Sequence, residues 1–113
     1  MTEEIQGGAP RPITPREVKM YEQEYKHGAE LFQKALQQYT QSDNPYQQAE
    51  FQNVMDKAMR ILNETAAELH RKSLLEQNNK IAQDYTAFND SPKDNRMVTE
   101  LNRDLDQAKK SIL

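Results

Sequence analysis

Apolar residues recur at alternating steps of three and four along much of the chain. In residues 15–41 the repeat runs through Val18, Tyr21, Tyr25, Gly28, Phe32, Ala35 and Tyr39. The last part of the chain has the same steps, at Val98, Leu101, Leu105, Ala108 and Ile112. Such steps keep side chains on one face of an α-helix, whereas no segment alternates like a β-strand over more than a few residues. We therefore predict an all-α protein.

Three signals for the start of a helix divide the chain. Each combines an N-cap residue, a proline at the first helical position and a polar residue at the third. They are Thr14-Pro15-Arg16-Glu17, Asn44-Pro45-Tyr46-Gln47 and Ser91-Pro92-Lys93-Asp94. We predict helices over 15–41, 45–89 and 92–113.

A single helical domain is expected over residues 14–113. Residues 1–13 hold Gly7, Gly8, Pro10 and Pro12 and carry no apolar repeat. Glycine and proline without periodic apolar positions are typical of irregular chain. We predict that residues 1–13 form a flexible tail.

The middle segment, 45–89, carries two apolar stripes. The first consists of Phe51, Val54, Met55, Ala58, Ile61, Leu62, Ala66 and Leu69, and the second of Leu74, Leu75, Ile81, Tyr85 and Phe88. At about 100° per residue, the centres of the two stripes lie about 150° apart around the helix. A continuous helix would give three long helices in antiparallel hairpins, an elongated rod that needs an oligomer to cover its apolar faces. A break near 77–80 would instead give a four-helix bundle.

The stretch Gln77-Asn78-Asn79-Lys80 is where we expect a break, if there is one. Asparagine tolerates the left-handed conformation that ends many helices. The stretch contains no glycine or proline, however, and glutamine and lysine are good helix formers. The sequence therefore favours the continuous helix, about 67 Å long.

Composition excludes several classes of protein. The chain has 113 residues, a net charge of −3 and no cysteine. Without cysteine there is no disulfide framework and no thiolate site, and an acidic chain is a poor match for nucleic acid. No apolar run approaches the roughly 20 residues of a membrane span, and the acidic N-terminus is unlike a signal peptide. We expect a cytoplasmic protein that binds neither nucleic acid nor membrane.

Candidate chemistry is sparse. Glu24 and His27 have the Glu-x-x-His spacing of di-iron bundles, but such sites need two copies of that motif. The apolar stripes carry no convergent polar residues, whereas a site inside a bundle places carboxylates and histidines on those faces. We therefore predict no catalytic, cofactor-binding or metal-binding residues and no enzymatic activity. A metal-binding or catalytic helical bundle is the alternative.

The expected function is binding of another protein. Short helical hairpins bury little apolar surface, so a partner helix or a second copy could cover the remainder. The candidate partner-binding stripe consists of Tyr21, Tyr25, Phe32, Tyr39, Leu74, Ile81, Tyr85 and Phe88. The other interpretation places the aromatic residues of the first hairpin in its core. A small helical adaptor or a chaperone-like protein would fit.

A short segment bears on the chaperone interpretation. Residues 58–69, AMRILNETAAEL, resemble helices of the small bacterial export chaperones of the flagellar type. The resemblance covers a dozen residues without a diagnostic motif, and does not assign the chain to that family.

Overall fold

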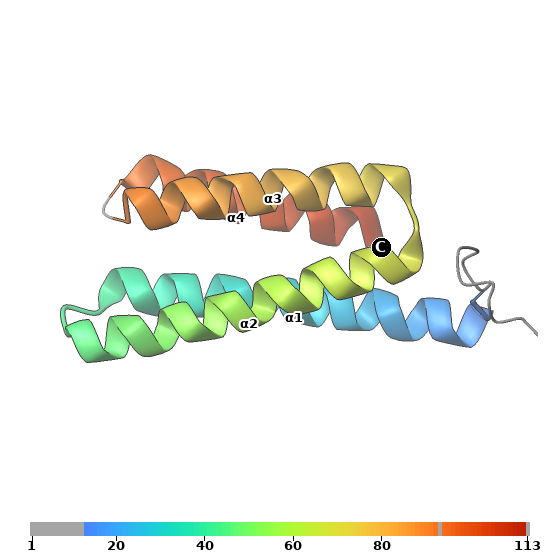
Figure 1. Cartoon of the computed structure of the whole chain (residues 1–113), viewed down its shortest axis with the longest axis horizontal. Coiled ribbons are helices and arrows are strands. Elements are labelled where there is room, and N and C mark those ends of the chain that lie inside the picture. The colour runs from blue at the N-terminus through green and yellow to red at the C-terminus, as the bar shows by residue number, and fades with distance from the viewer. Residues whose placement is uncertain (1–12, 93, 113) are drawn as a thin grey trace, which may run out of the picture.

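The computed structural model describes residues 13–92 and 94–112 and contains four helices. They are α1 (Pro15–Gln41), α2 (Pro45–Leu69), α3 (Lys72–Asp90) and α4 (Asn95–Ile112). Figure 1 shows two antiparallel hairpins, α1–α2 and α3–α4, lying side by side. Contacts of α1 with α4 and of α2 with α3 join the hairpins. The described residues form no strand, so the predicted all-α class is confirmed.

The first two predicted helix starts are confirmed and the third is displaced. The Thr14 hydroxyl accepts from the Glu17 backbone and the Glu17 side chain accepts from the Thr14 backbone, which completes a capping box. The Asn44 side chain accepts from the first backbone amides of α2. The last helix begins at Asn95 instead of residue 92, because the Asp94 carboxylate accepts from the Arg96 backbone at 2.9 Å.

The prediction of one continuous helix over 45–89 is wrong. The alternative prediction, a break near 77–80, is also wrong, because the chain turns earlier. The helix ends at Leu69, and His70 adopts a left-handed conformation with φ 53° and ψ 34°. The next helix starts two residues later, whereas 77–80 lies inside α3. A helix over 45–89 would measure about 67 Å, longer than the 56 Å long axis of the molecule.

The turn at His70 reconciles the two stripes of the middle segment. They point in different directions along one straight helix, but reversing the chain between them lets both face the same core. Arg71, at the start of α3, forms an ion pair with Glu22 of α1 and so ties the turn to the first hairpin. The expected rod of three long helices is thus replaced by a bundle of four helices, in which the two hairpins pack on each other.

Residues from all four helices form one core. Its buried apolar side chains are Tyr25, Ala29, Phe32, Ala35, Leu36, Met55, Ala58, Met59, Leu62, Ala66, Leu69, Leu74, Ile81, Tyr85, Phe88, Leu101, Leu105 and Ala108. Ile13, which the sequence assigned to the tail, packs against this core. The rest of the expected tail, residues 1–12, lies outside the described residues.

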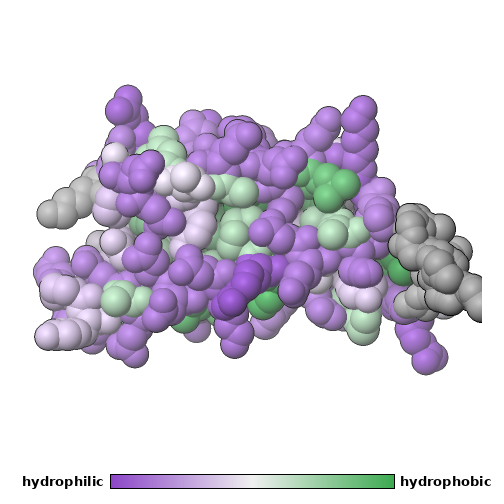
Figure 2. Space-filling model, in the orientation of Figure 1, coloured by the Kyte–Doolittle hydropathy of each residue, from purple (hydrophilic) through white to green (hydrophobic). Residues whose placement is uncertain are grey.

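The outer surface is mostly polar. Figure 2 shows polar side chains over most of the visible face, with apolar ones in small separate patches. Among the residues described, the large apolar side chains that stand exposed are Met20, Tyr46 and Leu75. None of the four helices is long and apolar enough to cross a membrane.

Candidate functional site

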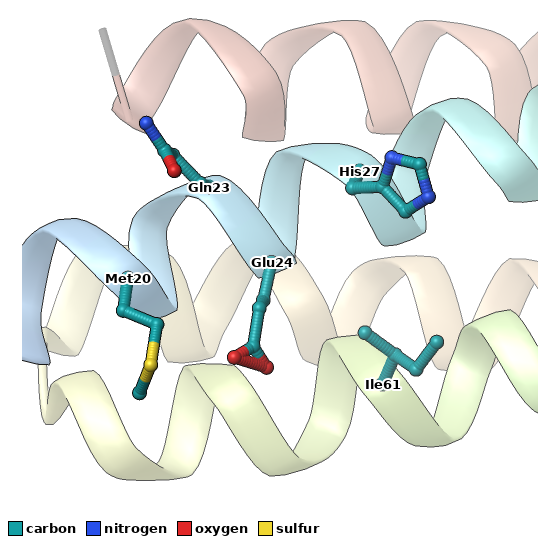
Figure 3. Close-up of a pocket in the computed structure, with 5 residues that line it drawn as sticks. All are labelled: Met20, Gln23, Glu24, His27 and Ile61. Atoms are coloured by element: carbon teal, nitrogen blue, oxygen red, sulfur yellow. The ribbon is translucent and has the colours of Figure 1, made fainter.

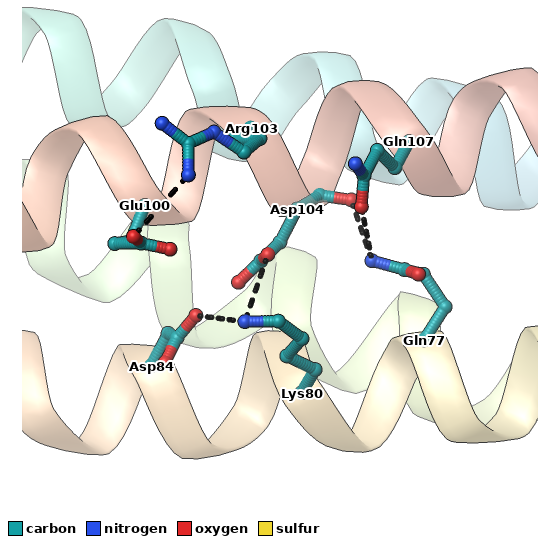
Figure 4. A network of polar contacts seen from close by, with 7 residues as sticks. All are labelled: Gln77, Lys80, Asp84, Glu100, Arg103, Asp104 and Gln107. Carbon is teal, nitrogen blue, oxygen red and sulfur yellow. Dashed lines mark hydrogen bonds and ion pairs between the residues drawn. The ribbon is translucent and has the colours of Figure 1, made fainter.

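Three carboxylates converge where α3 packs against α4. Asp84 belongs to α3, and Glu100 and Asp104 lie one turn apart on α4. One oxygen of each lies within 4.8 Å of an oxygen of the other two (Figure 4). Residues four apart share a helix face, so Glu100 and Asp104 both reach the seam. We call Asp84, Glu100 and Asp104 the carboxylate cluster.

Asp104 is the most deeply buried member of this cluster. Only 1% of the residue is exposed, and its neighbours Leu101, Leu105 and Ala108 belong to the core. Within the described part of the chain, neither Asp104 carboxylate oxygen has a hydrogen-bond partner, nor does Oδ2 of Asp84. Burying a charged carboxylate without compensating hydrogen bonds is costly. The cluster therefore requires a proton or a nearby cation.

Lys80 supplies positive charge at the solvent edge of the cluster. Its Nζ lies 3.5 Å from Oδ1 of Asp104 and 3.6 Å from Oδ2 of Asp84 (Figure 4). Charge-assisted hydrogen bonds are shorter, about 2.7–2.9 Å. Half of the Lys80 side chain is exposed, so its ammonium is free to move into solvent. The lysine neutralises part of the charge without satisfying the buried oxygens.

Burial raises the pKa of Asp104 to about 7, from a usual value of 3.8. The adjacent Asp84 carboxylate adds to the rise, and Lys80 opposes it. Below that pKa, the protonated carboxyl of Asp104 becomes a hydrogen-bond donor, and Asp84 is the adjacent acceptor. Protonation thus allows a hydrogen bond between two of the buried carboxylate oxygens that otherwise have no partner.

The raised pKa predicts that the bundle gains stability on acidification. Because the folded protein holds this proton more tightly than the unfolded chain, stability falls as pH rises from about 4 to about 7 and then levels off. Going from pH 8 to pH 5 should raise the free energy of unfolding by about 2–3 kcal/mol. Urea denaturation in the presence of a chelator measures this change.

The Asp104→Asn variant is the control for the pH prediction. An amide mimics the protonated carboxyl in shape and does not titrate, so the variant should lose most of the pH dependence between 5 and 8. The Asp43→Asn variant changes an exposed carboxylate in the α1–α2 loop and should keep it. A native protein that became more stable as pH rose through this range would contradict the assignment.

The sequence interpretation missed this cluster because it treated the apolar stripes as free of polar residues. Two positions contradict that statement. Asp104 follows Leu101 by three residues and precedes Ala108 by four, and Asn78 stands between Leu74 and Ile81 with steps of four and three. Both are buried. Their spacing was the available signal, since residues three or four apart share a face.

Asn78 belongs to a second polar group, inside the bundle. The Tyr25 hydroxyl donates to Oδ1 of Asn78 at 3.0 Å, and Nδ2 of Asn78 donates to Oδ1 of Asn63 at 2.7 Å. Burial raises the pKa of Tyr25 above its usual range, so the hydroxyl stays a neutral donor. This chain of hydrogen bonds links α1, α3 and α2 and makes the helix at residue 78 part of the core.

The predicted partner-binding stripe faces inward. Two of its members, Tyr21 and Tyr39, are half-buried. The other six are buried: Tyr25, Phe32, Leu74, Ile81, Tyr85 and Phe88. Rings of the two hairpins pack on each other, with Phe32 and Tyr85 centroids 4.9 Å apart and those of Tyr39 and Phe88 5.5 Å apart. In the folded bundle most of this stripe is covered by the chain itself, as in the interpretation that places the aromatic residues in the core.

A shallow groove of about 410 Å³ lies on the outer face between α1 and α2. Its lining residues are Met20, Gln23, Glu24, His27 and Ile61 (Figure 3). Met20 is 45% exposed, and Gly28 lets α1 approach α2 here, because a Cβ at this position would lie 2.9 Å from Cγ2 of Ile61. Glu24 and His27 thus stand at a surface groove and not inside the bundle.

Comparison with known proteins assigns neither a family nor a function to this chain. Models of protein families, curated protein sequences and solved structures were compared with this chain, and none matches it.

Proposed function

We propose that this protein is a non-enzymatic, cytoplasmic interaction module that binds a helix of another protein in the α1–α2 groove. The observation that carries the proposal is the exposed Met20 beside the half-exposed Ile61, in a groove between two helices. Methionine is common at binding surfaces because its flexible, polarisable side chain adapts to its neighbour. An adaptor or chaperone-like role fits this chemistry, and no cofactor is needed for it.

Acidic side chains flank the groove and indicate the character of the partner. Glu24 lies between Met20 and Ile61 in Figure 3. Glu64 and Glu68 follow Ile61 by three and seven residues, so they share its face of α2, and all three glutamates are exposed. Because α1 and α2 are antiparallel, Glu64 and Glu68 extend from Ile61 towards the Met20 end of the groove.

An amphipathic helix with an apolar stripe between lysines or arginines complements this surface. Its apolar side chains would cover Met20 and Ile61, and its cations would lie against the glutamates. A second copy of this chain presents the same three glutamates at its groove, so it complements this surface less well than a helix rich in lysine or arginine does. We therefore propose a different protein as the partner and not self-association through this groove.

The experiment compares capture of partner proteins by two variants with that by the native protein. Met20→Glu places a charge in the groove at an exposed helical position, and should abolish capture without lowering the melting temperature. Tyr46→Ser is the matched control, since Tyr46 is 83% exposed near the start of α2, at the other end of the hairpin. It should leave capture unchanged.

Two results would contradict the proposal. One is a partner that Met20→Glu retains and Tyr46→Ser loses, because the interaction would then lie at the other end of the hairpin. The other is a native protein that dimerises at micromolar concentration and becomes monomeric on Met20→Glu. Light scattering of both variants, measured beside the capture assay, distinguishes a lost partner from a lost dimer.

A further inference from the structure

The carboxylate cluster on the second hairpin has the composition of a cation site. Its three members, Asp84, Glu100 and Asp104, supply only oxygen donors, and these lie within 4.8 Å of one another. Carboxylate oxygens are the ligands that Mg²⁺, Ca²⁺ and Mn²⁺ prefer, whereas zinc and copper sites favour histidine and cysteine. The cluster lies on α3 and α4, away from the α1–α2 groove.

An independent observation distinguishes this cluster from an ordinary acidic surface. Asp104 is 99% buried and is directed at the other two carboxylates (Figure 4). Among the residues described, neither of its carboxylate oxygens has a hydrogen-bond partner, and its contact with Lys80 is an ion pair at 3.5 Å. Core carboxylates in proteins are paired, protonated or bound to metal. The seam therefore holds an acceptor whose hydrogen-bonding capacity is unused.

The charges around the cluster leave it negative. Among the described residues, Lys80 and Arg103 are the cations that contact it, Lys80 at 3.5 and 3.6 Å from the two aspartates and Arg103 at 3.4 Å from Glu100. Both side chains are at least half exposed. When Asp104 is ionised, three carboxylates thus face two cations that sit at the solvent edge, and neither cation is as deeply buried as Asp104.

We propose that Asp84, Glu100 and Asp104 bind one hard divalent cation of the Mg²⁺, Ca²⁺ or Mn²⁺ class between α3 and α4. The flexible Lys80 side chain moves into solvent when the cation enters. Its ammonium lies 3.5 and 3.6 Å from the aspartate oxygens, where it would be repelled by a divalent cation bound to them. Water fills the remaining coordination positions on the open side. A cation held by both helices fastens the second hairpin and stabilises the fold by mass action.

Mn²⁺ alone is the probe for this site, since its free aqueous form is measured directly by electron paramagnetic resonance. The native protein should bind one equivalent, and Asp104→Asn should weaken binding by more than about tenfold because it removes a charged ligand. Asp43→Asn makes the same chemical change in the α1–α2 loop and should bind as the native protein does. Mg²⁺ and Ca²⁺ should compete with Mn²⁺ for the site.

Lys80→Gln provides the sharpest variant, because the proposal and a purely structural ion pair predict opposite results. Removing the competing ammonium should tighten Mn²⁺ binding by about tenfold. Without metal the same variant should melt at a lower temperature than the native protein, and Mn²⁺ should restore that loss. If Lys80 serves only to neutralise the aspartates, the loss persists whether or not metal is added.

Glu100→Gln controls for the possibility that Asp104→Asn weakens metal binding by disturbing the fold, since Asp104 is buried in the core. Glu100 is only half-buried, so this variant leaves the core intact and should still weaken Mn²⁺ binding by about tenfold. The proposal is overturned if neither the native protein nor Lys80→Gln binds Mn²⁺ at millimolar concentration. It is also overturned if Asp104→Asn and Glu100→Gln bind Mn²⁺ like the native protein, or if Asp43→Asn loses as much binding as they do.

Discussion

Replacing Phe88 by alanine is expected to lower the free energy of unfolding by about 3–5 kcal/mol. Phe88 is fully buried in α3, where its ring packs edge-on against Tyr39 and is stacked with Tyr85 at 6.4 Å between centroids. Truncation removes apolar contact area and leaves a cavity between the hairpins. Small domains are stable by only about 5–15 kcal/mol, so this one change removes a large share of the total. Urea denaturation followed by circular dichroism measures it.

Phe51→Ala is the matched control for Phe88. Phe51 is half-buried on α2 and lies outside the core cluster, so its truncation should cost about 1 kcal/mol. The comparison also tests the orientation of the aromatic stripe. If Phe88→Ala were as stable as the native protein, Phe88 would face outward, as the sequence-based partner-binding stripe required.

Asn78→Ala is expected to cost about 2–3 kcal/mol, although alanine is the better helix former. The substitution leaves the Tyr25 hydroxyl buried without its acceptor and opens a small cavity beside it. These two losses exceed the gain in helix propensity, which is about 0.5 kcal/mol. The measurement is the midpoint of urea denaturation, and Tyr25→Phe combined with Asn78→Ala should cost less than the sum of the single changes.

The neighbouring Asn79 is the control, because it is exposed in the same turn of α3. Asn79→Ala should raise stability by about 0.5 kcal/mol through helix propensity alone. An equal gain in stability from the two substitutions would show that residue 78 is not buried. A loss on both substitutions would be the result for a helix that turns at residues 78 and 79.

The helices themselves were largely predictable from the sequence. Local chemistry set their starts, since the hydroxyl of Thr14 and the amide of Asn44 cap the helices they precede, and the prolines that follow need no backbone partner. The three-and-four spacing of apolar residues identified the faces that are buried in α1 and α4. Both kinds of signal act within a few residues, so the sequence was enough to give the all-α class.

The site was less predictable, because its residues come together only across helices. The buried position of Asp104 could be inferred from its place between Leu101 and Ala108, but its proximity to Asp84 depends on how α4 packs against α3. The groove likewise depends on the register of two helices, which Gly28 and Ile61 fix by close approach. The spacing of residues along a helix shows which side chains share a face, but it does not show which residues of another helix pack against that face.

By itself, the sequence determined the class of fold, two of the four helix starts and the presence of two stripes about 150° apart in the middle segment. Only the tertiary structure decided where that segment turns. His70 accepts a left-handed conformation without being glycine, since burying both stripes and pairing Arg71 with Glu22 compensates for a local cost of about 1 kcal/mol. Asn78 remains helical for the converse reason: its amide is bound to Tyr25 and Asn63, so an intrinsic tendency to end helices is overruled by contacts with residues distant in the sequence.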